Sequence, residues 1–231
     1  MKNVAVLLAG GSGKRMGGNL PKQFLLIGDK PIIQHTMNCF EHHALIDEIC
    51  IVIHPDFVSK MAELVRNNAF QKVKHILTGG KERSDSSLAA IKAYSNEQLV
   101  NLIFHDAVRP FVSERIISDV VAEVQQGKSV AVAIPTTDTI LKVTAENCIE
   151  SVPVRSSLRR AQTPQAFPFA VIKKAYDLAL NDEHFVATDD CGVVLKYLPQ
   201  EKIYIVEGDE SNIKITFERD LIRGNKKGEI R

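Results

Sequence analysis

The segment VAVLLAGGSGKRMGGNLPKQF, residues 4–24, runs from an apolar stretch directly into a glycine-rich loop. The apolar part, Val4–Leu8, is short and continuous, which is typical of a strand covered on both faces. Glycine lets backbone N–H groups approach a bound phosphate or base closely. The loop region carries three such glycines and three cations: Gly10, Gly11, Gly13, Lys14, Arg15 and Lys22. This combination indicates a triphosphate site after the first strand.

Two common phosphate-binding motifs do not match this loop. A P-loop, G-x-x-x-x-G-K-[ST], needs Ser or Thr after Gly13-Lys14, where Arg15 stands, and a glycine where Leu8 stands. A dinucleotide fingerprint, G-x-G-x-x-G, needs a glycine where Met16 stands. A glycine turn without a ligand would not explain the adjacent Lys and Arg.

The rest of the chain alternates short apolar runs with longer helical patterns. The strand candidates are Val4–Leu8, Glu48–Ile53, Val73–Leu77, Leu99–Phe104, Val130–Ile134 and Ile203–Val206. The helix candidates are Pro31–His42, Asp56–Asn67, Ser84–Ala93, Glu114–Gln126, Phe169–Leu180 and Asp189–Leu198. Ser113 and Thr188 suit N-caps, and Gly127 suits a helix end. We therefore expect one α/β domain, residues 1–231, with a doubly wound, mostly parallel sheet.

One segment breaks the alternation. TTDTILKVTAENCIESVPVRSS, residues 136–157, reads as a hairpin with its turn near 145–147 and has no helical partner. We expect a β-arm at about residues 137–158 that projects from the sheet. A two-stranded arm is marginally stable alone, so it is expected to pack on another subunit as a homodimer contact. The alternative is an ordinary edge hairpin. QTPQ, residues 162–165, returns the chain to the sheet.

The bulk composition narrows the class of protein. With 29 Lys and Arg against 28 Asp and Glu, the net charge of +1 gives no footprint for nucleic acid or an anionic membrane. The four cysteines form no C-x-x-C pair, which favours reduced thiols. The first apolar run is too short for a signal peptide or a membrane span. We expect a cytoplasmic protein.

Further polar motifs follow three of the predicted strands. In GGKERSDSS, residues 79–87, the serines open a helix, whose N-terminus favours anions. In HDAVRPF, residues 105–111, Asp106 ends a strand, where open α/β sheets bind ligands, and can face Mg²⁺. His105 is more often structural. In SNIKIT, residues 211–216, Lys214 points away from its apolar neighbours and needs an anion.

The run G-G-x-G-x-R-M-x(4)-P-K-Q, together with the other motifs in order, resembles the 2-C-methyl-D-erythritol 4-phosphate cytidylyltransferase family, including the related ribitol-5-phosphate cytidylyltransferases. The resemblance covers nearly the whole chain. It implies a nucleotidyltransferase fold, CTP and a small polyol phosphate as substrates, Mg²⁺ as cofactor, and transfer of CMP with release of pyrophosphate.

The resemblance also assigns residues. Nucleotide-binding positions fall on Leu8, Ala9, Gly10, Gly11, Ser12, Gly13, Gly80, Arg83, Ser86 and Asp106, with Asp106 also at the metal. Catalytic positions fall on Arg15, Lys22, Arg155 and Lys214, and acceptor positions on Arg109, Thr139, Arg155 and Thr163. Two positions depart from the family: Lys81 and Ser211 stand where acidic residues are frequent. Asp209 or Glu210 could replace an acidic ligand at 211.

Several readings remain open on the sequence. RRAQTPQAF and GGKERSDS favour methylerythritol phosphate as acceptor, whereas LLAGG, HDAVRPF and GDESNIKIT favour ribitol phosphate. We expect the first. A non-catalytic nucleotide-binding module is disfavoured by the intact cations. A nicotinamide-dependent oxidoreductase is disfavoured by the missing third glycine and by His54, which stands where an acidic residue would end the second strand.

Overall fold

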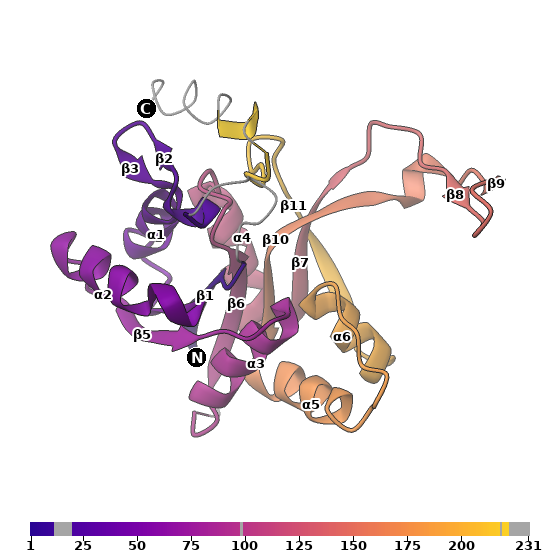
Figure 1. The fold of residues 1–231 in the computed structure, drawn as a ribbon. Helices are drawn as coiled ribbons and strands as arrows, with labels where there is room; N and C mark the ends of the chain where they lie inside the picture. Colours follow the sequence, from indigo (N-terminus) through magenta and orange to yellow (C-terminus); the bar gives the residue numbers. More distant parts are fainter. Residues whose placement is uncertain (12–19, 98, 218, 222–231) are drawn as a thin grey trace.

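The computed structural model describes residues 1–11, 20–97, 99–217 and 219–221. They form a seven-stranded sheet with helices on both faces (Figure 1). The strands of this sheet are β1 (Lys2–Ala9), β4 (Glu48–Ile53), β5 (Val73–Thr78), β6 (Val100–Asp106), β7 (Ser129–Pro135), β10 (Arg159–Pro168) and β11 (Ile203–Glu207). The α-helices are α1 (Ile32–Glu41), α2 (Val58–Asn67), α3 (Arg83–Ala93), α4 (Glu114–Gln125), α5 (Phe169–Ala179) and α6 (Asp190–Tyr197).

The strand order is β11-β7-β10-β6-β1-β4-β5. From β1 the chain moves outward to β4 and β5, then returns to place β6 on the other side of β1. This reversal is a topological switch point, and open α/β sheets bind ligands in the crevice that such a point leaves at the carboxyl ends of the strands. The fold therefore places its ligand crevice beside β1, directly before the glycine-rich loop.

Burial on both faces of the sheet explains the continuous apolar runs. Along β1, Ala5 and Leu7 belong to a core that includes buried residues of α1, α2 and α4. Val4 and Val6 belong to the opposite core, with buried residues of α3, α5 and α6. The predicted doubly wound, mostly parallel sheet is confirmed, and all six predicted strands are present within two residues of their expected ends.

The tenth strand is the main element absent from the predicted strand set. As far as the described residues go, β10 is the one strand of the large sheet that runs antiparallel to its neighbours, β6 and β7. Its sequence, RRAQTPQAFP, carries two prolines, which argue against a central strand because proline cannot donate to the ladder. Pro164 lies where the register with β7 shifts, between Ala161 and Gln165, so the sheet tolerates it.

The observed helix starts differ from the predicted ones in three places. The first residue of α3 is Arg83, not Ser84, and Glu82 caps it through a capping box with Asp85. The expected helix from Asp56 begins with a 3-10 turn, Pro55–Phe57, before α2. Asp189 caps α6 by accepting from the Gly192 N–H, so the expected cap at Thr188 is wrong.

Two other helix ends follow the sequence. The Ser113 side chain caps α4 by accepting from the Ile116 N–H, and Gly127 ends that helix with a φ of +82°. The short hairpin β2 (Leu26–Ile27) and β3 (Lys30–Pro31) was not expected; Gly28, with a φ of +61°, makes its turn.

No helix among the described residues has the length and apolar character that a bilayer crossing requires.

The segment between β7 and β10 projects away from the rest of the described chain (Figure 1). Its tip is a two-stranded sheet of β8 (Lys142–Val143) and β9 (Ile149–Ser151), with Asn147 in a left-handed turn. Its large apolar side chains are exposed: Ile140, Leu141, Val143, Ile149, Val152 and Val154. The arm therefore has almost no core of its own.

Candidate active site

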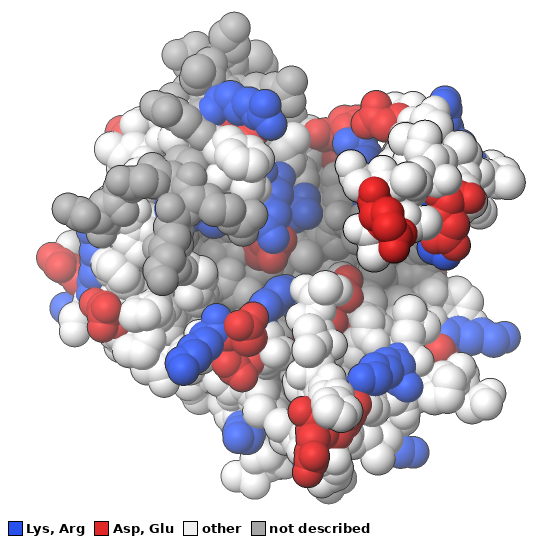
Figure 2. All heavy atoms as spheres, turned by 45° about the vertical axis from the view of Figure 1, so that its right-hand side comes forward, with Lys and Arg blue, Asp and Glu red and all other residues white. Residues whose placement is uncertain are grey.

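A cleft of about 910 Å³ lies at the carboxyl ends of β1, β4, β5 and β6. Figure 2 shows a hollow on this side of the molecule in which Lys and Arg side chains gather beside acidic ones. Ten predicted site residues line the cleft: Leu8, Ala9, Gly10, Gly11, Lys22, Gly80, Arg83, Ser86, Asp106 and Lys214. The fold thus brings together, from five distant parts of the chain, residues suited to an anionic ligand.

Glycines let the walls of this cleft close on one another. A Cβ on Gly10, after β1, would lie 2.7 Å from the Ser86 Oγ, and one on Gly79, after β5, would lie 2.5 Å from the same atom. Both distances are shorter than real Cβ contacts allow. A Cβ on Gly80 would meet the Asp85 carboxylate that caps α3. At Gly10 and Gly79 the atom met is the rotatable Ser86 hydroxyl, whereas at Gly80 the capping Asp85 would have to shift. The three glycines thus let the first turn of α3 pack closely against the strand ends.

Gln23 is a cleft residue to which the sequence analysis gave no role. Its buried side chain donates from Nε2 to the Ala9 carbonyl at 2.8 Å and to the Gly11 carbonyl at 3.5 Å. It therefore ties the turn that carries Lys22 to the start of the glycine-rich loop. The sequence feature that could have identified Gln23 is its position beside Lys22 in the P-K-Q motif.

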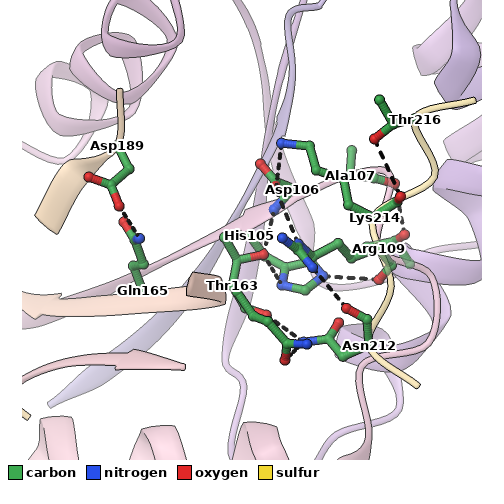
Figure 3. Close-up of polar contacts among 12 residues, drawn as sticks. His105, Asp106, Ala107, Arg109, Thr163, Gln165, Asp189, Asn212, Lys214 and Thr216 are labelled. Carbon is green, nitrogen blue, oxygen red and sulfur yellow. Dashed lines mark hydrogen bonds and ion pairs between the residues drawn. The ribbon is translucent and has the colours of Figure 1, made fainter. Parts of the chain in front are cut away.

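Asp106 lies at the centre of the charged groups (Figure 3). Its Oδ2 forms ion pairs with the Lys214 Nζ at 3.0 Å and with the Arg109 Nε at 3.2 Å. Burial alone would raise the pKa of this carboxyl, but the charges of Lys214, Arg109 and Arg83 outweigh burial and hold the pKa well below its usual range. Asp106 is therefore ionised at any physiological pH.

His105 is linked to the Asp106 backbone through the hydroxyl of Thr163. The Thr163 Oγ1 accepts from the Asp106 N–H at 3.1 Å and lies 3.0 Å from the His105 Nδ1. The His105 Nε2 lies 3.1 Å from the Arg109 carbonyl, which can only accept, so Nε2 carries the proton and the Thr163 hydroxyl donates to Nδ1. Burial lowers the pKa of His105 to about 4. The expected structural role of His105 agrees with these contacts.

The segment that carries Lys214 is hydrogen-bonded to the turn that follows β6. Arg109 donates to the Asn212 carbonyl at 2.8 Å, and the Ile215 N–H donates to the Val108 carbonyl at 2.9 Å. The buried Asn212 side chain donates to the Thr163 carbonyl at 2.8 Å. Lys214 is therefore held beside Asp106 by contacts of its neighbours with the turn after β6 and with β10.

Arg83, the first residue of α3, also lines the cleft. It donates at 2.6 Å to Asp190, whose side chain is fully buried at the start of α6. Burial would lower the pKa of Arg83, but Asp190 and Asp106 outweigh it and raise that pKa. Asp190 is the second aspartate of the TDD sequence, residues 188–190, at the start of α6, so a residue of this helix start contacts a cleft residue.

Other predicted positions lie elsewhere. Arg155 donates to the Thr139 Oγ1 at 2.9 Å on the exposed arm, so these two residues meet, but neither lines the cleft. The guanidinium of Arg109 and the hydroxyl of Thr163 are turned to the contacts above, and their acceptor roles stay predictions. Ser12, Gly13 and Arg15 lie outside the described residues.

The donor groups fit one Mg²⁺ held partly by substrate. Mg²⁺ commonly binds one or two carboxylates together with substrate phosphates. Both ion pairs of Asp106 use Oδ2, which leaves Oδ1 for a further ligand. Among the described residues no group of three or more acidic, His or Cys side chains could hold a metal alone. Glu210 pairs with Arg160, and Asp209 accepts from the Ser211 N–H, so neither faces the cleft.

Comparison with known proteins agrees with this geometry. Residues 3–226 match the family model of IspD, 2-C-methyl-D-erythritol 4-phosphate cytidylyltransferase. A Thermobifida fusca protein of that name is 42% identical over 94% of this chain and 89% of its own length. The Haemophilus influenzae bifunctional ribulose 5-phosphate reductase/CDP-ribitol pyrophosphorylase Bcs1 is 44% identical over 97% of this chain, which spans only 48% of that protein.

A solved structure has the same fold. The 4-diphosphocytidyl-2C-methyl-D-erythritol synthase of Anaerococcus prevotii superposes with a TM-score of 0.87 at 27% identity, covering 99% of this chain and 96% of its own. With the family model matched across nearly the whole length, the chain belongs to the 2-C-methyl-D-erythritol 4-phosphate cytidylyltransferase family, whose members are CTP-dependent nucleotidyltransferases.

Proposed function

We propose that this protein transfers CMP from CTP to 2-C-methyl-D-erythritol 4-phosphate and releases pyrophosphate, a step of isoprenoid precursor synthesis. The observation that carries the proposal is the cleft itself. It brings Lys22, Arg83, Asp106 and Lys214 into one cleft at the switch point of the sheet, in a member of this family. The free thiols of all four cysteines are compatible with a cytoplasmic site of action.

The reaction needs positioning and charge more than proton transfer. An ionised oxygen of the acceptor phosphate attacks the α-phosphorus of CTP, a P–O bond forms, and the bond to the β-phosphate breaks with pyrophosphate leaving. No base is required because the attacking group is already ionised. Lys22 and Lys214 would reduce the repulsion between the two anions and stabilise the charge that develops at phosphorus.

Mg²⁺, when bound, would neutralise part of the triphosphate charge. Asp106 is the residue of this chain that would hold it, through the oxygen not used by Lys214 and Arg109. The depressed pKa of Asp106 keeps that carboxylate charged. A single protein carboxylate with phosphate oxygens is a common magnesium environment.

We also propose that the arm completes the site of a second copy in a homodimer. The apolar side chains exposed along the arm would be buried by such contact, and Arg155 and Thr139 lie on the arm rather than in the cleft of their own chain. The planar guanidinium of Arg155 suits a phosphate, since it can bond two oxygens at once. In this arrangement Arg155 would bind the acceptor phosphate opposite Lys22 of the other copy.

Ribitol 5-phosphate is the second candidate acceptor. The specific observation in its favour is the 44% identity to the Haemophilus influenzae protein named for CDP-ribitol synthesis. The chemistry at phosphorus would be the same, and only the polyol part of the acceptor would differ. A non-catalytic binding role is disfavoured because the family's cations are intact in the sequence, at Arg15, Lys22, Arg155 and Lys214, and two of them, Lys22 and Lys214, line the cleft.

The proposal is tested by pyrophosphate release with each of the four nucleoside triphosphates, Mg²⁺ and methylerythritol 4-phosphate. We expect release with CTP, and loss of most activity in Asp106→Asn. Absence of release with CTP and either polyol phosphate, from a folded protein, would contradict the proposed activity.

A further inference from the structure

Asp190 is a fully buried carboxylate that belongs to none of the predicted site positions. Its Oδ2 accepts a hydrogen bond from the Arg83 Nη1 at 2.6 Å, and its Oδ1 accepts one from the Tyr176 hydroxyl at 2.7 Å. Tyr176 is itself buried, in α5. Removing a carboxylate from water is unfavourable unless both oxygens are bonded to donors. Arg83 and Tyr176 supply both, so the carboxylate is fixed in one orientation beneath the cleft wall.

The start of α6 is itself anchored, so Asp190 cannot shift easily. Asp189 uses Oδ1 to cap α6 at the Gly192 N–H, at 2.8 Å, and Oδ2 to accept from the Gln165 Nε2, also at 2.8 Å (Figure 3). Gln165 in turn accepts from the Cys191 N–H at 3.3 Å. These contacts tie the first turn of α6 to β10 on both sides of Asp190.

Arg83 lies between two carboxylates. Its side chain is 23% exposed and lines the cleft, while both Asp190 and Asp106 favour its charged form. Its Nη2 is buried and has no hydrogen-bond partner among the described residues. Without Asp190, this guanidinium would still be attracted by Asp106, which already forms ion pairs with Lys214 and Arg109.

We propose that Asp190 is a positioning residue that holds the Arg83 guanidinium in the wall of the nucleotide cleft and away from Asp106. Asp190 acts on the nucleotide through Arg83 and does not touch the substrate. The proposal rests on the proposed function, because it assigns Asp190 to the binding of CTP. It predicts that Asp190 affects the nucleotide much more than the acceptor.

The test compares Asp190→Asn with Asp189→Asn. Both remove one negative charge from neighbouring residues of the same turn. Asn at 189 keeps an acceptor for the helix cap at Gly192 and gives up the acceptor for the Gln165 Nε2, so this control loses one anchor of the turn but no contact to Arg83. Titration calorimetry with CTP alone and initial rates with both substrates are measured for each. We expect Asp190→Asn to weaken CTP binding and raise KM for CTP on the order of 10-fold, the range of one charge-assisted hydrogen bond. The KM for the acceptor should change little, and Asp189→Asn should change CTP binding much less than Asp190→Asn does.

A double-mutant cycle separates positioning from general stability. If Asp190 acts through Arg83, Asp190→Asn should weaken CTP binding no further in an Arg83→Met background. Full additivity of the two changes, or equal effects of Asp190→Asn on both substrates, would overturn the proposal. So would an unchanged affinity for CTP in Asp190→Asn.

A milder variant covers the case in which Asp190→Asn does not fold. Tyr176→Phe removes the donor to Oδ1 without leaving a buried charge unpaired, and it should shift CTP affinity in the same direction by a smaller factor. Wild-type affinity in Tyr176→Phe would then count against the proposal. Wild-type protein that neither binds CTP nor releases pyrophosphate would instead refute the proposed function, so the two failures are distinguishable.

Discussion

Replacing His105 with Gln should remove a loss of stability that the wild-type protein suffers below neutral pH. His105 is fully buried, packed in a tilted arrangement against Phe40 with ring centroids 5.1 Å apart, and hydrogen-bonded at both ring nitrogens. Burial lowers its pKa from 6.5 to about 4. A histidine whose pKa is lower in the folded state binds its proton preferentially in the unfolded state, so stability decreases as the pH falls from the unfolded-state pKa to the folded-state pKa.

The size of the effect follows from the two pKa values. Above pH 7 the ring is neutral in both states and contributes nothing. The unfolded chain protonates first as the pH falls, and the penalty reaches about 2 kcal/mol at pH 5 and about 3 kcal/mol at pH 4, below which it stays constant. Asp106 does not interfere in this window, because its lowered pKa adds stability that is lost only at more acidic pH.

Urea unfolding at pH 7 and pH 5 measures this difference. Wild type should lose about 2 kcal/mol more than His105→Gln between the two values. Any packing defect in the variant is an offset common to both pH values and cancels. His42→Gln, which changes an exposed histidine at the end of α1, is the matched control and should keep the wild-type pH dependence. Equal pH dependence in wild type and His105→Gln would refute the buried, neutral state of His105.

Three further predictions concern activity. Lys22→Ala should lower kcat on the order of 10²–10³-fold, as expected for a preorganised charge at the transition state, and wild-type turnover in a rate assay would exclude that role. Gly10→Val should sharply weaken CTP binding by calorimetry, because the first atom of its side chain would already meet the Ser86 Oγ at 2.7 Å; wild-type affinity would show that this close approach is not needed. Arg155→Ala should raise KM for the acceptor more than for CTP, and a mixed dimer with Lys22→Ala should recover part of the activity. Equal effects on both KM values, or an inactive confirmed heterodimer, would argue against the arm contributing to the site of the other copy.

The parts of the fold that depend on local pattern could be predicted. Continuous apolar runs located β4 to the residue, and cap chemistry located the start of α4, since both signals act within a few neighbouring residues. β10 was absent from the predicted strands because Pro164 contradicts a central strand, and only the register shift with β7 explains why the sheet accepts it. That shift depends on a partner strand far away in the sequence.

The candidate site also contains residues that a local sequence pattern could predict and residues whose contacts depend on distant parts of the chain. Asp106 and Lys214 stand in motifs with a recognisable chemical purpose, and the structure places them 3.0 Å apart. The Asp190 contact to Arg83 joins residues 107 positions apart, and a TDD sequence at a helix start is fully explained by capping alone. No local pattern distinguishes the aspartate that caps the helix from the one that reaches the cleft.

The most direct test of the account is the ratio of kcat/KM for methylerythritol 4-phosphate and ribitol 5-phosphate, measured by pyrophosphate release with CTP and Mg²⁺. We expect turnover with CTP and a clear preference for methylerythritol 4-phosphate. A preference for ribitol 5-phosphate would keep the mechanism and contradict the proposed acceptor. No release with either compound would contradict the proposed CMP transfer itself.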